Sequence, residues 1–526
     1  MLCLTIFSFS VNATTYYVSV DGNNSFPGTQ EQPFKTIQKG ADIAIAGDTV
    51  MVMPGDYNEH VEMPRHVSGT PEAKITFQSV ENKSAKVRCF TLGDNNYMRF
   101  DGFEITNCLT GWDSKSGIYA ASTKGIDIVN NYIHDVYYVG IQCGQNCYIA
   151  NNHIYKTTKG LTVNSNSTVE YNEVERPYRW GIHEGDGIAD QGDSDYMRFF
   201  GQNVTIKNNK FWGMQREDIG GSHNDCIQTF NHCFDNLLVE NNYCFNASGF
   251  IMASVEKCNA VTNNVIIRNN VIAHVTYGID FDERYGLGYS NVSIYNNTFF
   301  DVKLQSMTIS KGENDFAKNN IIIVSDINSS ATSLQGILIP LSSNNIINGP
   351  RIGAKYFVGT NNMINIYPGK TVEEVGEILF VDATNYDFRL KPDTNAVNTG
   401  TNLLGTVDYD IEGNARPKGN VWDLGAYEYD DGSKVAICID FNYSTWGACS
   451  NGTQTRTITS HRPTGCIGGN PENLTRTCTT LHPICEQHLE RYNQTQILEA
   501  KQQWFNGGLT LNEIILRAKI RKHCPI

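Results

Sequence analysis

The sequence lacks long apolar runs, a high density of charge and any basic stripe. Beyond the N-terminus, no segment approaches the roughly 18 consecutive apolar residues expected of a membrane-spanning helix. Charged residues make up only 18% of the chain, and the 55 acidic against 41 basic residues give a formal net charge of −14. A chain of this kind is a poor partner for a phosphate backbone. We therefore expect no transmembrane segment and no nucleic-acid partner.

Tryptophan is also scarce, with six residues in 526, whereas glycine is abundant at 46. The chain is too long for one ordinary domain, but a solenoid escapes that limit because each repeat contacts only its neighbours. Abundant glycine and few charges suit a stack of short strands joined by tight turns.

A phrase of alternating apolar residues followed by paired asparagines recurs about every 20–30 residues. One copy spans residues 291–300, and others surround Asn131, Asn152, Asn172, Asn209, Asn242, Asn270 and Asn320. Asparagine tolerates the left-handed backbone of tight bends, and stacked asparagine amides can bond one another as a ladder. The L-x-x-L-x-L spacing of leucine-rich repeats is absent. The pattern predicts an all-β fold, a right-handed parallel β-helix solenoid.

The N-terminal part of the chain is expected to hold a signal and a cap. Residues 1–13 read as the apolar part of a secretory signal that lacks a basic start, so the protein should be secreted. Residues 14–59 are the expected cap and first coil, with an amphipathic helix ending near Ala46. This opening resembles exported β-helix proteins, polysaccharide lyases among them, in which a short helix covers the open end of the stack. An uncovered end coil would expose unpaired strand backbone.

Residues 60–345 are the expected coils, and residues 346–430 the closing segment. Within the latter, residues 410–417 and 423–429 resemble the phrases that finish the last coil in many secreted β-helix proteins. Cys143 and Cys147 have no second pair at zinc-finger spacing, which disfavours a metal there.

The C-terminal part predicts a small disulfide-bonded β module and a helical hairpin. Six of the 15 cysteines crowd this end: Cys438, Cys449, Cys466, Cys478, Cys485 and Cys524. Residues 437–480 resemble a thrombospondin type 1 repeat through residues 446–456, which implies that Trp446 stacks between Arg456 and Arg476. Residues 481–526 carry a helical pattern broken at Gly507-Gly508, typical of a hairpin or a docking module. These modules could associate the protein with a cell surface.

A second recurring phrase, a small residue before an apolar one, aligns the coils. It includes Gly140-Ile141, Gly187-Ile188, Cys226-Ile227, Gly249-Phe250 and Gly278-Ile279. If the apolar member points inward, Asp186 and Asp225 share one outward position, and Gln228 and Asp280 share another. Adjacent coils are about 4.8 Å apart. Asp186 and Asp225 would then be neighbours that share a proton or a cation.

The longest steps between coils flank these carboxylates, so extra loop lies beside them. The insertions carry Glu184, Asp193, Asp195, Arg198, Arg216, Glu217, Asp218 and His223. Long loops in a compact fold often bind ligands. We expect Glu184, Arg216, His223 and Gln228 to contact a substrate. A solvated acidic face is the alternative, as is a loop role for His223.

One reaction that fits is β-elimination on an acidic polysaccharide. The region resembles β-helical pectate lyases, which hold calcium on clustered aspartates and use a lysine base on a later coil. The resemblance implies Ca²⁺ at Asp280, Asp282 and Glu283, because oxygen ligands suit calcium. It also implies Lys311 as the base. Arg284 and Lys257 are other candidates for this role.

A second reaction that fits is glycoside hydrolysis by a carboxylate pair, Asp186 with Asp225 or Asp225 with Asp280, at about 5–9.5 Å. Many carboxylates and few tryptophans favour the lyase, because a cation can bridge them to an anionic glycan. A surface protein that binds glycans without cleaving them is the remaining alternative.

Overall fold

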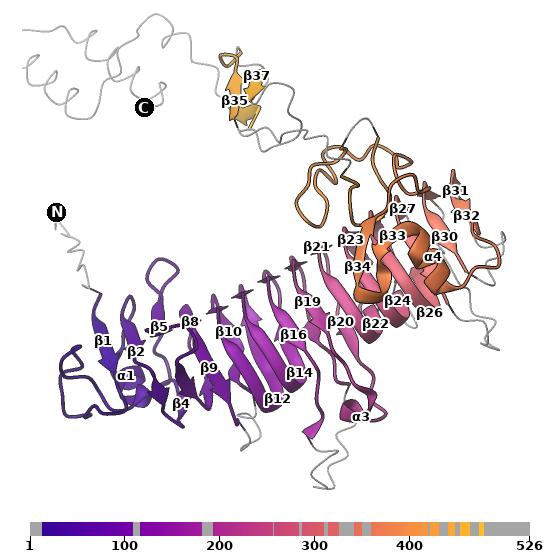
Figure 1. Ribbon diagram of the computed structural model, residues 1–526. Helices are drawn as coiled ribbons and strands as arrows, with labels where there is room; N and C mark the ends of the chain where they lie inside the picture. Colours follow the sequence, from indigo (N-terminus) through magenta and orange to yellow (C-terminus); the bar gives the residue numbers. More distant parts are fainter. Residues whose placement is uncertain are drawn as a thin grey trace, which may run out of the picture. The chain divides into compact units, whose positions relative to one another are not determined.

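The computed structural model describes residues 13–108, 116–180, 193–255, 257–282, 287–309, 314–325, 341–349, 359–418, 421–430, 440–447, 453–462 and 473–477 (Figure 1). The chain divides into two compact units, Met1–Ser433 and Lys434–Ile526. Among the described helices, none has both the length and the apolar character needed to cross a membrane.

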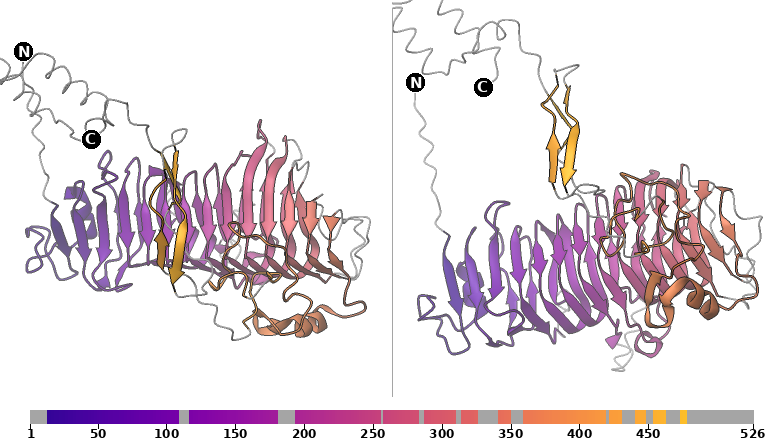
Figure 2. Two further views of the ribbon diagram at one scale, coloured as in Figure 1. Left: turned by 90° about the horizontal axis from the view of Figure 1, so that it is seen from above. Right: turned by 45° about the horizontal axis from the view of Figure 1, so that its top comes forward.

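The first unit is a parallel β-helix, which confirms the predicted fold class. Its strands lie side by side along the unit in parallel sheets (Figure 2). One sheet contains β1 (Thr15–Val18), β2 (Thr49–Val52), β5 (Ile75–Ser79), β8 (Met98–Asp101), β11 (Asp127–Val129), β13 (Tyr148–Ala150), β15 (Thr168–Glu170), β18 (Thr205–Lys207), β21 (Leu237–Glu240), β23 (Thr262–Arg268), β25 (Tyr289–Tyr295), β27 (Phe316–Lys318), β29 (Leu341–Ser343) and β31 (Gly359–Thr360).

The second sheet supplies the remaining faces of each coil. It contains β3 (Gly55–Asp56), β4 (His60–Glu62), β6 (Ala85–Val87), β7 (Cys89–Thr91), β9 (Phe103–Thr106), β10 (Ile118–Lys124), β12 (Tyr132–Gln145), β14 (His153–Val163), β16 (Glu173–Glu175), β17 (Met197–Phe199), β19 (Lys210–Trp212), β20 (Asp225–Phe230), β22 (Tyr243–Ser254), β24 (Val271–Asp282), β26 (Thr298–Ile309), β28 (Ile321–Val324), β30 (Ile346–Asn348) and β32 (Met363–Ile364). Long strands such as β22 and β24 contain a residue of positive φ, Asn246 and His274 respectively. We infer that each bends there and covers two faces of its coil.

The asparagine ladder predicted from the sequence is present. From Asn152 onward, each Oδ1 atom accepts hydrogen bonds from the backbone N–H and the Nδ2 of the asparagine one coil earlier, at 2.8–3.1 Å. Its rungs are Asn131, Asn152, Asn172, Asn209, Asn242, Asn270, Asn297, Asn320, Asn345 and Asn362. The residue before most rungs, such as Asn241, has positive φ, as expected of asparagine at a tight bend.

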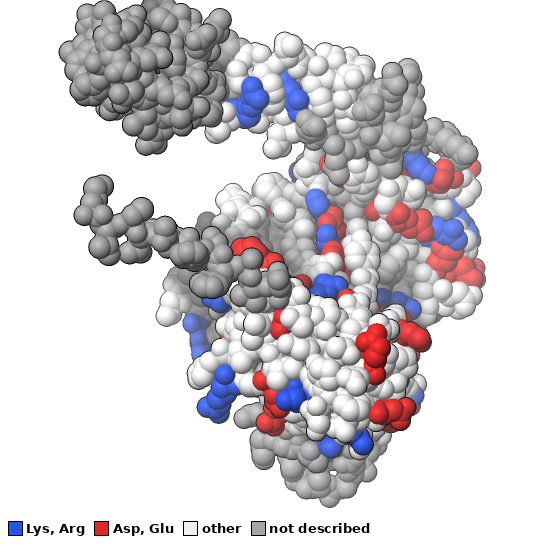
Figure 3. All heavy atoms as spheres, turned by 90° about the vertical axis from the view of Figure 1, so that its left-hand side faces the viewer, with Lys and Arg blue, Asp and Glu red and all other residues white. Residues whose placement is uncertain are grey.

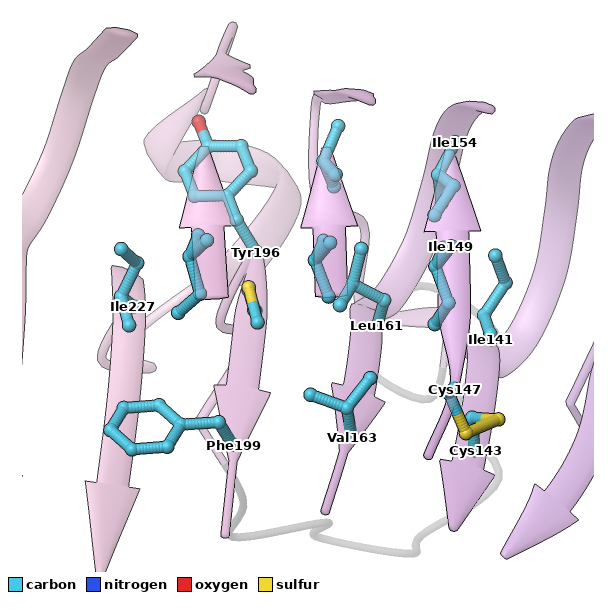
Figure 4. Close-up of a cluster of buried hydrophobic side chains, with 14 of the residues drawn as sticks. Ile141, Cys143, Cys147, Ile149, Ile154, Leu161, Val163, Tyr196, Phe199 and Ile227 are labelled. Atoms are coloured by element: carbon cyan, nitrogen blue, oxygen red, sulfur yellow. A yellow bond between two sulfur atoms is a disulfide. The ribbon is translucent and has the colours of Figure 1, made fainter. Parts of the chain in front are cut away.

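Apolar side chains of successive coils stack inside the helix (Figure 4). The parallel register aligns Ile118, Ile141, Leu161 and Met197, and then Ile227, Ile251, Ile279 and Met307. All eight are at most 1% exposed. Four disulfides join cysteines of the coils: Cys89–Cys108, Cys143–Cys147, Cys226–Cys244 and Cys233–Cys258. The core therefore fixes which residues of neighbouring coils lie side by side.

The helix predicted near the N-terminus is α1 (Ile37–Ile43), which packs on the first coil. Thr36 caps it by accepting a hydrogen bond from the backbone N–H of Lys39. A Cβ atom at Gly40 would lie 2.7 Å from Cγ1 of Val50, so the close approach of helix and strand requires glycine. On the described part of this end, acidic and basic side chains are scattered among uncharged ones (Figure 3).

The closing segment packs against the outer face of the later coils. Its elements are α4 (Val372–Leu379), β33 (Phe380–Asp382), the 3₁₀ turn η2 (Ala383–Asn385) and β34 (Asp387–Leu390), and β33 pairs with β34. Phe380 and Phe388 join a buried cluster with Phe245 and Phe300 of the coils. The described part of the closing segment therefore covers the coils around β22, β24 and β26.

The second unit contains two antiparallel strand pairs among its described residues. They are β35 (Asp440–Tyr443) with β37 (Ile458–Arg462), and β36 (Thr453–Thr455) with β38 (Thr475–Thr477). The ring of Trp446 lies 4.6 Å from the guanidinium of Arg456 and 4.4 Å from that of Arg476. The predicted stacking is therefore present, and the thrombospondin resemblance stays a prediction. The six terminal cysteines and residues 481–526 lie outside the described residues.

Candidate functional site

The register of β17 and β20 brings Asp195 and Asp225 together. Arg198 pairs with Gln228, so Asp195 lies one coil before Asp225 in the same register position. The backbone N–H of Asp225 donates to Oδ1 of Asp195 at 2.9 Å. Both residues are 0% exposed. Two buried carboxylates from residues 30 apart in the sequence are thus adjacent in the fold.

The sequence predicted such a pair but assigned Asp186 to it instead of Asp195. The prediction aligned Gly187-Ile188 with the inward stack, whereas Met197 takes that place, preceded by the buried Tyr196. Tyr196 occupies the position that is glycine in most other coils. The pattern of a small residue before an apolar one therefore does not identify this coil. Asp186 itself lies outside the described residues.

Three side chains hold the carboxylates. Nε of Arg198 donates to Oδ2 of Asp195 at 2.7 Å, and Nη2 of Arg198 lies 3.2 Å from Asp193. Nδ1 of His223 lies 2.9 Å from Oδ2 of Asp225. Nε2 of Gln228 donates to Asp193 and Asp225, each at 3.3 Å. His223 and Gln228 were predicted as substrate contacts, and the structure places both in this cluster.

Burial sets the protonation of the cluster. It raises the pKa of Asp195 to about 7, helped by the charge of Asp225 and opposed by Arg198. Burial also raises the pKa of Asp225, against the hydrogen bond from His223. That same hydrogen bond raises the pKa of His223 to about 9 although burial opposes it. Near neutral pH, His223 is therefore protonated and Asp195 is close to its midpoint.

These pKa shifts predict how stability depends on pH. The pKa of His223 is about 9 in the folded protein against 6.5 ordinarily. Its stabilising contribution is therefore complete below pH 6.5 and is lost as the pH rises through 9. With allowance for partial exposure, this amounts to about 2 kcal/mol. The raised pKa of Asp195 acts in the same direction between its ordinary 3.8 and about 7.

We expect His223→Gln to flatten the alkaline part of this dependence. The measurement is the free energy of unfolding by chemical denaturation at pH 6 and pH 9, for the wild type and the variant. An equal fall in both proteins would contradict the assignment, because groups elsewhere would then account for it.

Several buried polar atoms of the cluster have no hydrogen-bond partner among the described residues. They are Oδ1 of Asp225, Oε1 of Gln228, Oδ1 of Asn224 and Oγ of Ser194. The position beside Asp225 in the next coil is Gly249, where a Cβ atom would overlap Oδ1 of Asp225. Buried acceptors without donors are costly unless something else satisfies them.

The cluster could hold a cation. Asp195, His223 and Asp225 each offer one ligand atom, and these atoms lie within 4.8 Å of one another. The two carboxylates offer oxygen ligands, which suit a hard cation such as Ca²⁺, with water or substrate completing its shell. The oxygen of Gln228, which has no partner among the described residues, is a further candidate ligand. Arg198 and protonated His223 oppose a cation here, so binding should favour the deprotonated cluster.

Lys159 is a candidate residue that the sequence pattern did not single out. Because Leu161 pairs with Met197, Lys159 lies in the same register position as Asp195, one coil earlier. Its Nζ is 3.1 Å from the hydroxyl of Tyr138 and 4.4 Å from the centroid of that ring. Lys159 is only 5% exposed and forms no ion pair within the described part of the chain. The sequence signal that could have identified Lys159 is its position two residues before Leu161, the same spacing that separates Asp225 from Ile227.

The register does not place Asp225 beside Asp280. Asp225 aligns with Gly249 and Tyr277, whereas Asp280 aligns with Met252 and Thr308. Gln228 and Asp280 do share an outward position as predicted, with one coil between them. The coil register predicted from the sequence is wrong by one residue at Gly249-Phe250, because Ile251, and not Phe250, pairs with Ile227 in the inward stack.

The other predicted site residues are less closely tied to the cluster. Arg216 is the first residue of α3 (Arg216–Ile219), beside β20 in Figure 1; it is exposed and donates to the backbone oxygen of Ser222 at 3.1 Å. Asp282 ends β24, and its side chain is not described. Glu184, Glu283, Arg284 and Lys311 lie outside the described residues.

Comparison with known proteins gives matches to two family models. Residues 67–189 match "Right handed beta helix region", and residues 20–64 match "Protein of unknown function (DUF1565)". A segment of 81 residues is 36% identical to the uncharacterized protein YwoF of Bacillus subtilis (strain 168). That segment is 15% of this chain and 17% of the relative, so the chain matches about a sixth of the relative's length.

The similar solved structures are distant. Pectate lyase Pel9A is 19% identical with a TM-score of 0.45, over 79% of this chain and 96% of that one. XylC in complex with xylose is 12% identical with a TM-score of 0.47, over 79% and 99%. A rhamnogalacturonan lyase is 17% identical with a TM-score of 0.39, over 72% and 94%.

Proposed function

We propose that this protein is a secreted polysaccharide lyase that cleaves a uronate-containing glycan at the Asp195–Asp225 cluster. The observation that carries the proposal is the buried, unpartnered oxygen of Asp225, beside Asp195, His223 and Gln228. An ordered water, a cation or a donor from a ligand would satisfy such an oxygen, and we propose a cation. The four disulfides of the coils support an oxidising, extracellular location.

Asp195, Asp225 and Gln228 would hold a calcium ion, with His223 at the edge of the site. When bound, the ion would neutralise the uronate carboxylate and acidify the neighbouring carbon-bound proton. The ligands predicted from the resemblance, at residues 280–283, remain a second candidate set on later coils.

Lys159 is the candidate base among the described residues. Its neutral amine would take the proton from the carbon next to the uronate carboxylate, and a carbon–carbon double bond would form as the bond to the leaving glycosidic oxygen breaks. The hydroxyl of Tyr138, 3.1 Å from Nζ, would give its proton to the leaving oxygen and regain one from Lys159. Lys311 and Arg284 remain alternative bases.

Glycoside hydrolysis by the same cluster is a second candidate. The pKa of Asp195 near 7 suits a general acid that is protonated at working pH. Asp225 would then activate water. Burial does not separate the two reactions, because both need a glycan to approach the same fully buried carboxylates; the product separates them.

The test is a screen of the secreted protein on polygalacturonate, alginate and neutral glycans, with and without chelator. We expect activity on an acidic glycan, seen as ultraviolet absorbance of an unsaturated product. Chelation should lower it by about 100-fold, and added Ca²⁺ should restore it. Calorimetric titration with Ca²⁺ alone should detect binding to the wild type that Asp225→Asn loses.

The other outcomes are informative in different ways. Reducing ends without unsaturated product, insensitive to chelator, would replace the lyase proposal by hydrolysis. Tight binding of a glycan with no product would replace it by a non-catalytic, adhesive role.

A further inference from the structure

A cavity on another face of the coils is lined by aromatic rings and amides. It has a volume of about 540 Å³ and lies between β19, β22 and the turn before β34. Trp212, Tyr243 and Tyr386 contribute rings, and Gln215, Asn246 and Asn385 contribute amides. A volume of this size suits a small ligand or one part of a chain. The cavity shares no lining residue with the Asp195–Asp225 cluster.

The aromatic rings are held in place by contacts with neighbouring side chains. Nε1 of Trp212 donates to Oε1 of Glu173 at 2.8 Å. The ring of Tyr386 lies 4.5 Å from that of Phe245, and its hydroxyl accepts from Nδ2 of Asn246 at 3.0 Å. Tyr386 has a φ of 63°, which is uncommon for a bulky residue and is maintained only where surrounding contacts enforce it. The cavity is therefore built before any ligand arrives.

One cationic side chain stands at this cavity. Lys210 lines it, with Nζ 4.1 Å from the centroid of the Trp212 ring and 3.3 Å from Oε1 of Glu173. Its side chain is 43% exposed, so Nζ can reach a ligand anion. Flat aromatic rings stack against the apolar face of a sugar ring, and amides bond its hydroxyls. A nearby ammonium adds a partner for a carboxylate.

We propose that this cavity is a carbohydrate-binding subsite that takes one acidic pyranose ring. The ring stacks on Trp212 or Tyr386, amides of Gln215, Asn246 and Asn385 bond its hydroxyls, and Lys210 pairs with its carboxylate. The subsite shares with the proposed function only the class of ligand, and it needs neither the cation nor turnover. It would hold a glycan on the protein whether or not the chain is cut.

The experiment is isothermal titration of the full chain, in chelator, with oligogalacturonate, oligoalginate and neutral xylo-oligosaccharide. Chelator stops cation-dependent cleavage, so binding is measured without turnover. We expect an acidic oligosaccharide to bind, and Trp212→Ala to weaken it by about tenfold or more. Lys210→Gln should weaken the acidic ligand and leave any binding of the neutral one unchanged.

Two further variants keep the test interpretable. Asn385 is exposed, and its side chain donates to Oδ2 of Asp382 at 2.7 Å. Asn385→Arg removes this surface hydrogen bond and should block the cavity while the coils stay folded. Tyr171→Ala removes a tyrosine that is 57% exposed and outside the cavity, and it should bind as the wild type does. Absence of binding to all three probes, or wild-type affinity in both Trp212→Ala and Asn385→Arg, would overturn the subsite. Asp225→Asn should leave this binding intact while it abolishes cleavage, which separates the two proposals.

Discussion

Asp225→Asn should lower the cleavage rate by about 1,000-fold, the largest functional effect that the site predicts. The substitution keeps the size of the side chain but removes the charge that a cation would need. It also removes an oxygen that has no hydrogen-bond partner among the described residues. The measurement is the initial rate of unsaturated product on the best acidic glycan.

The fold should survive this substitution, because Asp225 is fully buried and burial raises its pKa. A neutral amide costs less to bury than a carboxylate, and its oxygen can still accept from His223. The substitution also weakens the pair with His223, so the unfolding temperature should fall by a few degrees while the transition stays cooperative. Asp235→Asn, outside the cluster, serves as the control and should retain its activity. If the Asp225→Asn variant is as active as that control, Asp225 has no role in cleavage and the proposed site is wrong.

Arg416→Ala should lower the free energy of unfolding by about 3–5 kcal/mol, the largest effect on stability. Arg416 and Glu428 form an ion pair at 2.7 Å in the closing segment, and both side chains are 0% exposed. Nη2 of Arg416 also donates to the backbone oxygen of Gly425 at 2.8 Å. Without the arginine, Glu428 is left buried and uncompensated, although burial already raises its pKa to about 7. Chemical denaturation of the first unit's transition measures the loss.

Arg389→Ala is the matched control for this prediction. Arg389 also pairs with a carboxylate, Asp387, at 2.5 Å, but its side chain is 55% exposed. Water screens such a pair, so its loss should change stability far less. Replacing Arg416 and Glu428 together by apolar residues should recover much of the loss, because no buried charge is then left alone. Equal effects of the two alanine variants would show that burial of the pair is not what matters.

The fold followed from the sequence because it rests on a repeated local pattern. Asparagine at a bend and alternating apolar residues each have a local cause, and their recurrence predicts that the coils stack. The ladder from Asn131 to Asn362 is the physical result. The predicted helix before Ala46 and the stacking of Trp446 were likewise marked by nearby residues.

The site was only partly predictable because it depends on register between coils. A register error of one residue changes which side chain is expected beside Asp225. Such an error occurs at Gly249-Phe250, and taking Gly187-Ile188 in place of Tyr196-Met197 has the same effect. Insertions of unequal length hide this register from a pattern search. Asp225 does lie beside an aspartate of the preceding coil, but that residue is Asp195 and not the predicted Asp186.

The sequence by itself determined that the chain is an all-β parallel solenoid whose coils are joined by asparagine bends. Only the tertiary structure decided which side chains meet: Asp195 with Asp225, Lys159 with Tyr138, and Trp212 with Tyr386 around one cavity. The reason is that periodicity is a property of neighbouring residues. Side-chain contact between coils depends on loop lengths and core packing, which no local pattern records.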